Sequence, residues 1–144
     1  MSDKVDVVLR TFRAVEERDP EALLALYHSE VEFNDAPSLP YGGTFRGKGE
    51  IREQLERGGE DTWLGTWGPL QPTEAERTMD PRVVAASDRE VVVLYRQRAV
   101  DPAGERFDAP VLGLYEVRDD RFARAQMFHF DTAAVVDFLA RAKR

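Results

Sequence analysis

The order of helices and strands is the feature that most restricts how this chain can fold. Apolar residues recur at helical spacing over residues 3–18, 20–27 and 48–57, whereas strand-like alternation dominates after residue 81. A helical pattern returns only at residues 132–142. Because the helices are grouped early and the strands late, we expect one α+β domain with an antiparallel sheet.

The strands and the longest irregular segment can be placed within this frame. One strand begins at Val31, and four more are predicted at residues 82–87, 90–100, 106–117 and 121–131. Residues 60–81 are interrupted by prolines and hold both tryptophans, so they are expected to form an irregular loop. Such a loop is either a lid or a wall packed over the sheet. With no repeat and no second domain, residues 1–144 are expected to form a single domain.

Composition and motifs narrow the possible functions. The formal net charge of −7 disfavours binding to nucleic acid, and no cluster of basic residues opposes it. The chain has no cysteine, its two histidines lack metal-ligand spacing, and no glycine-rich phosphate loop is present. Its start lacks the apolar run of a signal peptide, and no segment is long enough to span a membrane. We therefore expect a cytoplasmic protein that uses no metal, cofactor, nucleic acid or membrane.

The segment at residues 31–43 contains the most informative acidic side chain. It begins as a strand, carries Asp35 at the end of that strand, and is then interrupted by Pro37, Pro40 and two glycines. A carboxylate beside a rigid loop can be partly buried and held still, as a general base requires. The alternative is that Asp35 only caps the backbone of the turn that follows it.

His129 is the candidate partner of Asp35. An imidazole titrates near neutral pH, which suits proton transfer. The alternatives are a structural histidine with satisfied hydrogen bonds and a residue at a dimer surface. Strict alternation over residues 121–131 places two sets of side chains on opposite faces of the strand: Phe122, Phe128 and Phe130 on one, and Ala125, Met127, His129 and Asp131 on the other. Asp131 has a simpler alternative role, as the N-cap of the last helix.

Four aromatic side chains are candidate ligand contacts. Tyr41 lies in the proline-stiffened loop after Asp35, and Tyr95 lies in the middle of a predicted strand. Trp63 and Trp67 offer flat surfaces on which a ring can stack. The alternative for the tyrosines is a place in the core or at the rim, and the tryptophans alternatively anchor their loop to the sheet.

A series of short motifs extends over nearly the whole chain. In order, they are Val7-Val8-Leu9-Arg10, Arg18-Asp19-Pro20-Glu21-Ala22-Leu23, Leu26-Tyr27-His28, Phe33-Asn34-Asp35-Ala36-Pro37, Phe45-Arg46-Gly47, Asp108-Ala109-Pro110 and Phe130-Asp131-Thr132. This series resembles the SnoaL-like and ketosteroid-isomerase-like branch of the nuclear transport factor 2 superfamily. The resemblance implies a cone-shaped, curved antiparallel sheet wrapped on three N-terminal helices plus a C-terminal helix, enclosing a pocket.

The resemblance also implies functional positions. The general-base aspartate of ketosteroid isomerases corresponds to Asp35, whereas their two oxyanion-hole donors correspond to Thr11 and Leu112. Because neither Thr11 nor Leu112 replaces those donors, a standard ketosteroid isomerase is disfavoured. Cyclases similar to SnoaL use an aspartate and a histidine that face a wide apolar pocket. Asp35 and His129 supply such a pair, with the Met127–His129 face directed into the cavity.

The sequence therefore favours a cofactor-free enzyme that performs acid/base chemistry on an apolar small molecule such as a polyketide or terpenoid. The reaction would be an isomerisation, cyclisation, dehydration or hydrolysis, with Asp35 and His129 as the catalytic residues. The alternative is a non-catalytic module of the same fold that binds a ligand or dimerises. The resemblance implies a homodimer through the sheet, and an apolar sheet face agrees with it. The predicted substrate contacts are Tyr41, Trp63, Trp67, Tyr95, Leu112, Met127 and Asp131.

Overall fold

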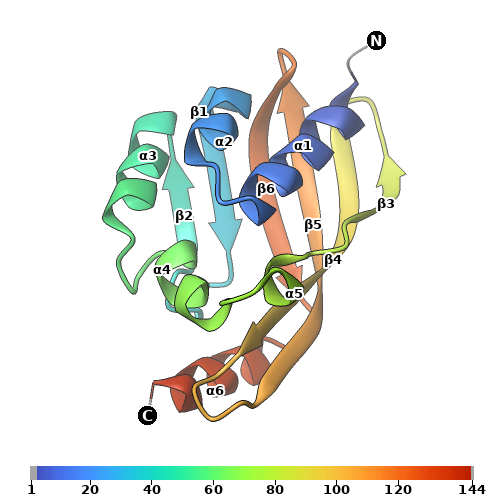
Figure 1. Ribbon diagram of the computed structural model, residues 1–144. Coiled ribbons are helices and arrows are strands. Elements are labelled where there is room, and N and C mark those ends of the chain that lie inside the picture. Colours follow the sequence, from blue (N-terminus) through green and yellow to red (C-terminus); the bar gives the residue numbers. More distant parts are fainter. Residues whose placement is uncertain (1–2, 144) are drawn as a thin grey trace.

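The computed structural model describes residues 3–143, which form a curved six-stranded sheet with helices over one face (Figure 1). The strand order across the sheet is β2-β1-β6-β5-β4-β3. The predicted α+β cone is therefore confirmed. The strands are β1 (Tyr27–Asp35), β2 (Gly43–Arg46), β3 (Arg82–Ala86), β4 (Glu90–Val100), β5 (Arg106–Arg118) and β6 (Arg121–His129).

The helices begin where the sequence provides side-chain caps. Asp3, Asp19 and Asp131 each accept a hydrogen bond from a backbone N–H in the first turn of the helix that follows. Such caps satisfy amide groups that a helix start leaves without partners. The helices are α1 (Lys4–Glu16), α2 (Pro20–Leu26), α3 (Lys48–Arg57), α4 (Trp63–Trp67), α5 (Glu74–Arg77) and α6 (Thr132–Ala142), with a 3₁₀ turn, η1 (Gly68–Leu70).

The sheet is mixed rather than antiparallel throughout. Strands β1 and β6 run parallel, and the other neighbouring strands run antiparallel. Strand β2 was not predicted, because four residues between glycines give too little alternation to detect. It pairs with β1 in antiparallel fashion, with Asp35 opposite Gly43. The loop between the two strands therefore lies beside the end of β1 that carries Asp35.

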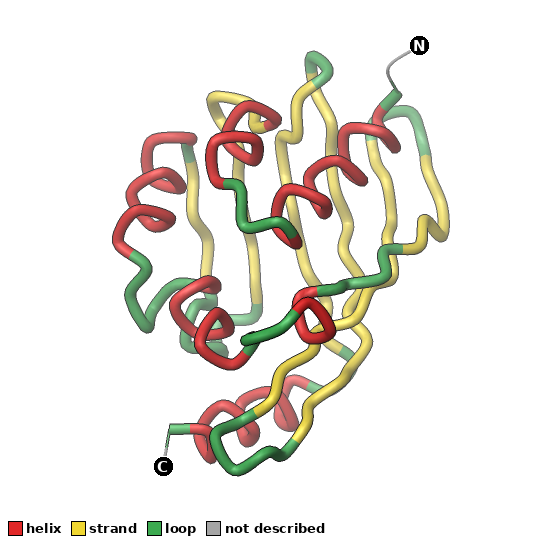
Figure 2. Tube along the Cα trace, in the orientation of Figure 1, coloured by secondary structure: helices red, strands yellow, loops and turns green. Residues whose placement is uncertain are grey.

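Two apolar clusters stabilise the fold. The larger cluster lies between α1, α2 and the sheet, and includes the fully buried residues Val8 and Val31. The smaller cluster joins α6 to the far ends of β4 and β5, which extend beyond the other strands (Figure 2). Trp67 lies at the centre of this second cluster, with its ring stacked 6.5 Å from that of Phe138. Residues far apart in the chain therefore close one end of the sheet.

The segment at residues 60–81 is more regular than expected, since it contains α4, η1 and α5. Several polar contacts attach it to the rest of the domain. The carboxylate of Glu16 accepts the Met79 N–H at 2.7 Å, and the guanidinium of Arg98 donates to the Thr78 carbonyl at 2.9 Å. Arg18 also donates to the buried side chain of Gln71. These contacts attach the segment to α1, to the turn that follows it and to β4.

A bulge changes which side chains of β6 face inward. The register between β5 and β6 shifts between Glu116 and Val117, so Phe122 lies in the core with an exposed fraction of 1%. Phe128 remains on the outer face, opposite Leu112 on β5. The predicted common face for Phe122 and Phe128 is thus corrected, because a bulge interrupts the strict alternation that the prediction assumed.

Candidate functional site

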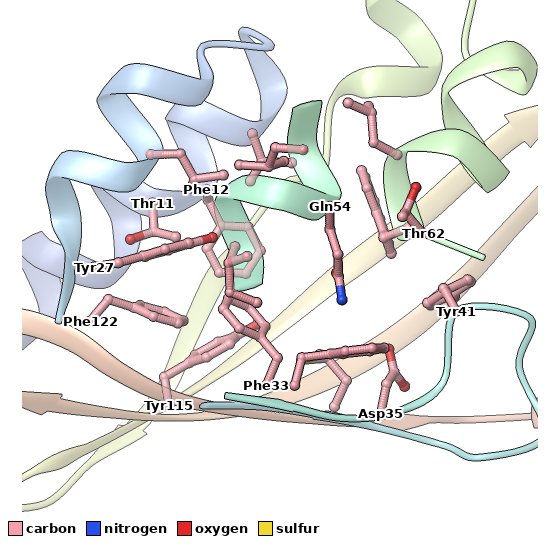
Figure 3. A pocket seen from close by; sticks show the side chains of 18 of the residues that line it. Thr11, Phe12, Tyr27, Phe33, Asp35, Tyr41, Gln54, Thr62, Tyr115 and Phe122 are labelled. Carbon is pink, nitrogen blue, oxygen red and sulfur yellow. The ribbon is translucent and has the colours of Figure 1, made fainter. Parts of the chain in front are cut away.

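A cavity of about 200 Å³ lies between the helices and the concave face of the sheet (Figure 3). Its walls come mainly from α1, α3, the segment containing Trp63, and the central strands. An apolar cavity of about 150 Å³ accommodates a benzene ring, so this one suits a compact body of one or two rings. Most of its lining is apolar, including Phe12, Phe33, Phe45, Ile51, Leu55 and Phe122.

Asp35 supplies the carboxylate of this cavity from the end of β1. Its Oδ1 accepts the Ala36 N–H at 2.8 Å and lies 3.0 Å from Nε2 of His129. The other oxygen, Oδ2, forms no hydrogen bond with any group in residues 3–143. The side chain is 9% exposed. Asp35 therefore combines the turn-capping role and the fixed orientation that the sequence left as alternatives, and it keeps one oxygen free.

His129 contacts Asp35 but is not among the residues that line the cavity. It stands at the end of β6, opposite Val111, and its side chain is 4% exposed. Met127, two residues earlier, does line the cavity, but His129 does not. Its Nδ1 is buried and has no partner among residues 3–143. The expected pair is thus present as a contact, although only its aspartate faces the cavity.

Three tyrosine hydroxyl groups occupy the same region as Asp35. Tyr41, Tyr95 and Tyr115 line the cavity. Burial raises the pKa of each phenol, and the negative charge of Asp35 raises it further. All three phenols are therefore protonated hydrogen-bond donors at neutral pH. The hydroxyl of Tyr41 is buried without a partner among residues 3–143.

Tyr115 is the functional candidate that the sequence did not reveal. A side chain on Gly113 would lie 2.1 Å from the Tyr115 hydroxyl, so the glycine provides the space for this ring. The cross-strand pairs join Tyr115 to Val91 and Tyr95 to Val111. Two features of the sequence could have indicated this position for Tyr115. Alternate residues of the two adjacent strands point inward, and a glycine lies two residues before the tyrosine.

Three predicted substrate contacts lie outside the cavity lining. Trp67 is fully buried in the second apolar cluster, because α6 covers it. Asp131 caps α6 by accepting the Ala134 N–H at 3.1 Å. Leu112 lies on the outer face and is 37% exposed, because its neighbour Val111 takes the inward position. Trp63, in contrast, does line the cavity.

Residues 3–143 contain no cluster of three or more His, Asp or Glu side chains arranged to hold a metal ion. In the same range, no helix is long and apolar enough to cross a membrane. The polar groups at Asp35 are its carboxylate, the nearby phenols and the imidazole of His129, and the cavity wall adds the side chains of Thr11, Gln54 and Thr62. Such a set can accept a proton and donate hydrogen bonds.

Comparison with known proteins identifies the class to which this arrangement belongs. Residues 8–125 match the SnoaL-like domain family, and the chain belongs to this family. Solved NTF2-like proteins share the fold of this chain. The search of curated protein sequences found no match.

Several solved structures have the same fold. TerC, co-crystallised with polyporic acid, is 20% identical, with a TM-score of 0.74 over 94% of this chain and 97% of that chain. An NTF2-like protein of unknown function from Burkholderia pseudomallei is also 20% identical, with a TM-score of 0.76 over 96% and 98% of the respective chains. A protein from Xanthomonas campestris, provisionally named a polyketide cyclase, is 17% identical, with a TM-score of 0.65 over 94% and 95%.

Proposed function

We propose that this protein binds a small, mostly apolar molecule and that Asp35 removes a proton from it without a cofactor. The observation that carries the proposal is the Oδ2 of Asp35, which forms no hydrogen bond within residues 3–143, in a mainly apolar cavity. A base in this position suits an isomerisation or cyclisation that begins at a carbon beside a carbonyl group. The provisionally named polyketide cyclase of the same fold supports a polyketide-like substrate.

The phenols give the reaction a second component. When Oδ2 takes the proton, the electron pair left on carbon moves to the carbonyl oxygen of the substrate. Tyr41, Tyr95 and Tyr115 are protonated donors in the same region, so one of them can stabilise that oxygen. These tyrosines would replace the donors missing at Thr11 and Leu112. Thr11 cannot take this role, because its hydroxyl donates to the Val7 carbonyl at 2.9 Å.

The proposal is tested by proton exchange in a simple ketone. The probe 2-tetralone has two rings, a size that suits the cavity, and acidic hydrogens beside its carbonyl group. In D₂O, the wild-type protein should accelerate replacement of those hydrogens by deuterium, followed by proton NMR. A rate equal to that of buffer would instead support the alternative function, a ligand-binding module. The absence of His129 from the cavity lining is the observation that favours this alternative.

His129 is proposed to position Asp35, since it contacts Oδ1 and does not line the cavity. His129→Phe removes the donor and should lower 2-tetralone exchange roughly tenfold, as expected when a partner that orients a functional group is lost. His129→Gln keeps an N–H donor and should recover most of the rate. His28→Gln is the control for loss of a histidine elsewhere. Equal losses in His129→Phe and His129→Gln would contradict the positioning role.

We also propose that the protein forms a homodimer through the outer face of its sheet. Leu112 and Phe128 are cross-strand neighbours on the outer face, with exposed fractions of 37% and 48%, and Phe130, just beyond β6, is 83% exposed. Contiguous apolar side chains of this kind usually need a partner surface. Wild-type protein should sediment as a dimer, whereas Phe128→Glu should sediment as a monomer. Val84→Glu, at an exposed apolar side chain on β3, is the control and should remain dimeric. A monomeric wild type would contradict this proposal.

A further inference from the structure

Gln54 is the polar side chain that α3 presents to the cavity. Figure 3 shows its amide extending from the helix toward the floor of the cavity, where Phe33 and Asp35 lie. On the same helix, Glu53 and Arg57 instead form an ion pair at the exposed surface, with Oε1 and Nε 2.9 Å apart. Gln54 therefore occupies an inward position, whereas most other polar side chains of this helix are exposed: Glu50, Arg52, Glu53, Glu56 and Arg57.

The hydrogen bonds of the cavity leave the Gln54 amide unused. The hydroxyl of Thr11 donates to the Val7 carbonyl at 2.9 Å. The hydroxyl of Thr62 donates to the Gly59 carbonyl at 2.6 Å and accepts the Gly65 N–H at 3.0 Å. The Gln54 side chain forms no hydrogen bond within residues 3–143. It thus retains both a donor and an acceptor in a wall that is mainly apolar.

This position affects which ligands can bind. A molecule that fills the cavity displaces water from the Gln54 amide, and an amide buried without a partner is unfavourable. A ligand with a polar group at the α3 wall restores the lost hydrogen bond, whereas a ligand without one does not. A site that bonds a polar group of its ligand therefore favours that ligand over an analogue without the group.

We propose that Gln54 determines specificity by binding a second polar group of the ligand, across the cavity from Asp35. The preferred ligands are then compact ring compounds with an oxygen substituent at each end. One oxygen lies among Asp35 and the tyrosines, and the other contacts the Gln54 amide. This inference rests on the proposed function, because it describes the substrate of the same cavity.

Two naphthalene probes test the inference by calorimetric titration. The compound 2-naphthol carries one hydroxyl, and 2,6-dihydroxynaphthalene carries hydroxyls at opposite ends. Wild-type protein should bind the dihydroxy compound roughly fivefold more tightly, the factor that one net hydrogen bond contributes. Gln54→Leu should abolish this preference, because the dihydroxy compound loses its hydrogen bond and 2-naphthol no longer leaves a buried amide without a partner. The control Glu56→Leu, an equivalent change on the exposed face of α3, should retain the preference.

Several results would contradict the role proposed for Gln54. The inference is overturned if wild-type protein binds the two probes equally or binds neither. It is also overturned if Gln54→Leu keeps the preference, or if it weakens both probes by the same factor, which would indicate a structural role. These titrations measure binding alone. A negative result for Gln54 can therefore be distinguished from a negative result for Asp35, which is tested by the exchange of 2-tetralone.

Discussion

Asp35→Asn is expected to lower the rate of 2-tetralone exchange by about 10²- to 10⁴-fold, the range typical of a lost general base. Asparagine has nearly the same size and keeps an oxygen that accepts the Ala36 N–H, which Asp35 accepts at 2.8 Å. The loop and the cavity should therefore be preserved. What disappears is the free carboxylate oxygen that takes the proton. Proton NMR in D₂O, at matched concentrations of variant and wild type, measures the change.

Asp131→Asn is the matched control for this substitution. Asp131 caps α6 and does not line the cavity. Since asparagine is about as good an N-cap as aspartate, neither stability nor exchange should change. Circular dichroism of both variants establishes that they are folded. If Asp35→Asn retained the wild-type rate while folded, Asp35 would not be the base.

Gly42→Ala is expected to destabilise the protein by about 3 kcal/mol or more, the upper part of the range for an overpacked site. A Cβ at this position would lie 1.9 Å from the carbonyl oxygen of Ala36. That oxygen is fixed, because it accepts the Leu39 N–H at 3.0 Å, and Gly42 in turn donates to the Leu39 carbonyl at 2.9 Å. The clash is with backbone, so the loop after Asp35 must move.

Urea unfolding followed by circular dichroism measures the free energy of unfolding of this variant. Gly49→Ala is the control, since a Cβ there meets no atom within 4 Å and the residue lies in α3. Alanine in place of a helical glycine should stabilise the protein by roughly 0.5–1 kcal/mol. Equal stability of Gly42→Ala and wild type would show that the loop is not held as described. A displaced loop should also slow 2-tetralone exchange.

Local signals in the sequence predict much of the fold. The caps at Asp19 and Asp131 mark helix starts, and α3 spans Lys48–Arg57 as expected. Errors arose where long-range pairing overrides local pattern. Strand β2 depends on pairing with β1, and the inward position of Phe122 depends on a bulge relative to β5. Neither feature produces a hydrophobic periodicity that can be recognised in the sequence alone.

In the candidate site, too, local features could be predicted and features that depend on long-range contacts could not. The sequence could single out Asp35 as a candidate because a strand end beside prolines is a local feature, and the structure places this residue in the cavity lining. The contact between Asp35 and His129 spans 94 residues of sequence, so the sequence could not tell which of the two faces the cavity. Tyr115 was missed because its place depends on the space left by Gly113. Trp67 was assigned to a ligand, since nothing local indicates that α6 covers it.

The most direct measurement of the central claim is a crystal structure of the protein with 2-tetralone bound. The cavity should hold the two rings, with the acidic carbon about 3–3.5 Å from Oδ2 of Asp35, the separation expected of reacting atoms. The carbonyl oxygen should lie within hydrogen-bonding distance of Tyr41, Tyr95 or Tyr115. Binding outside the cavity, or with the acidic carbon directed away from Asp35, would contradict the proposed role of this carboxylate.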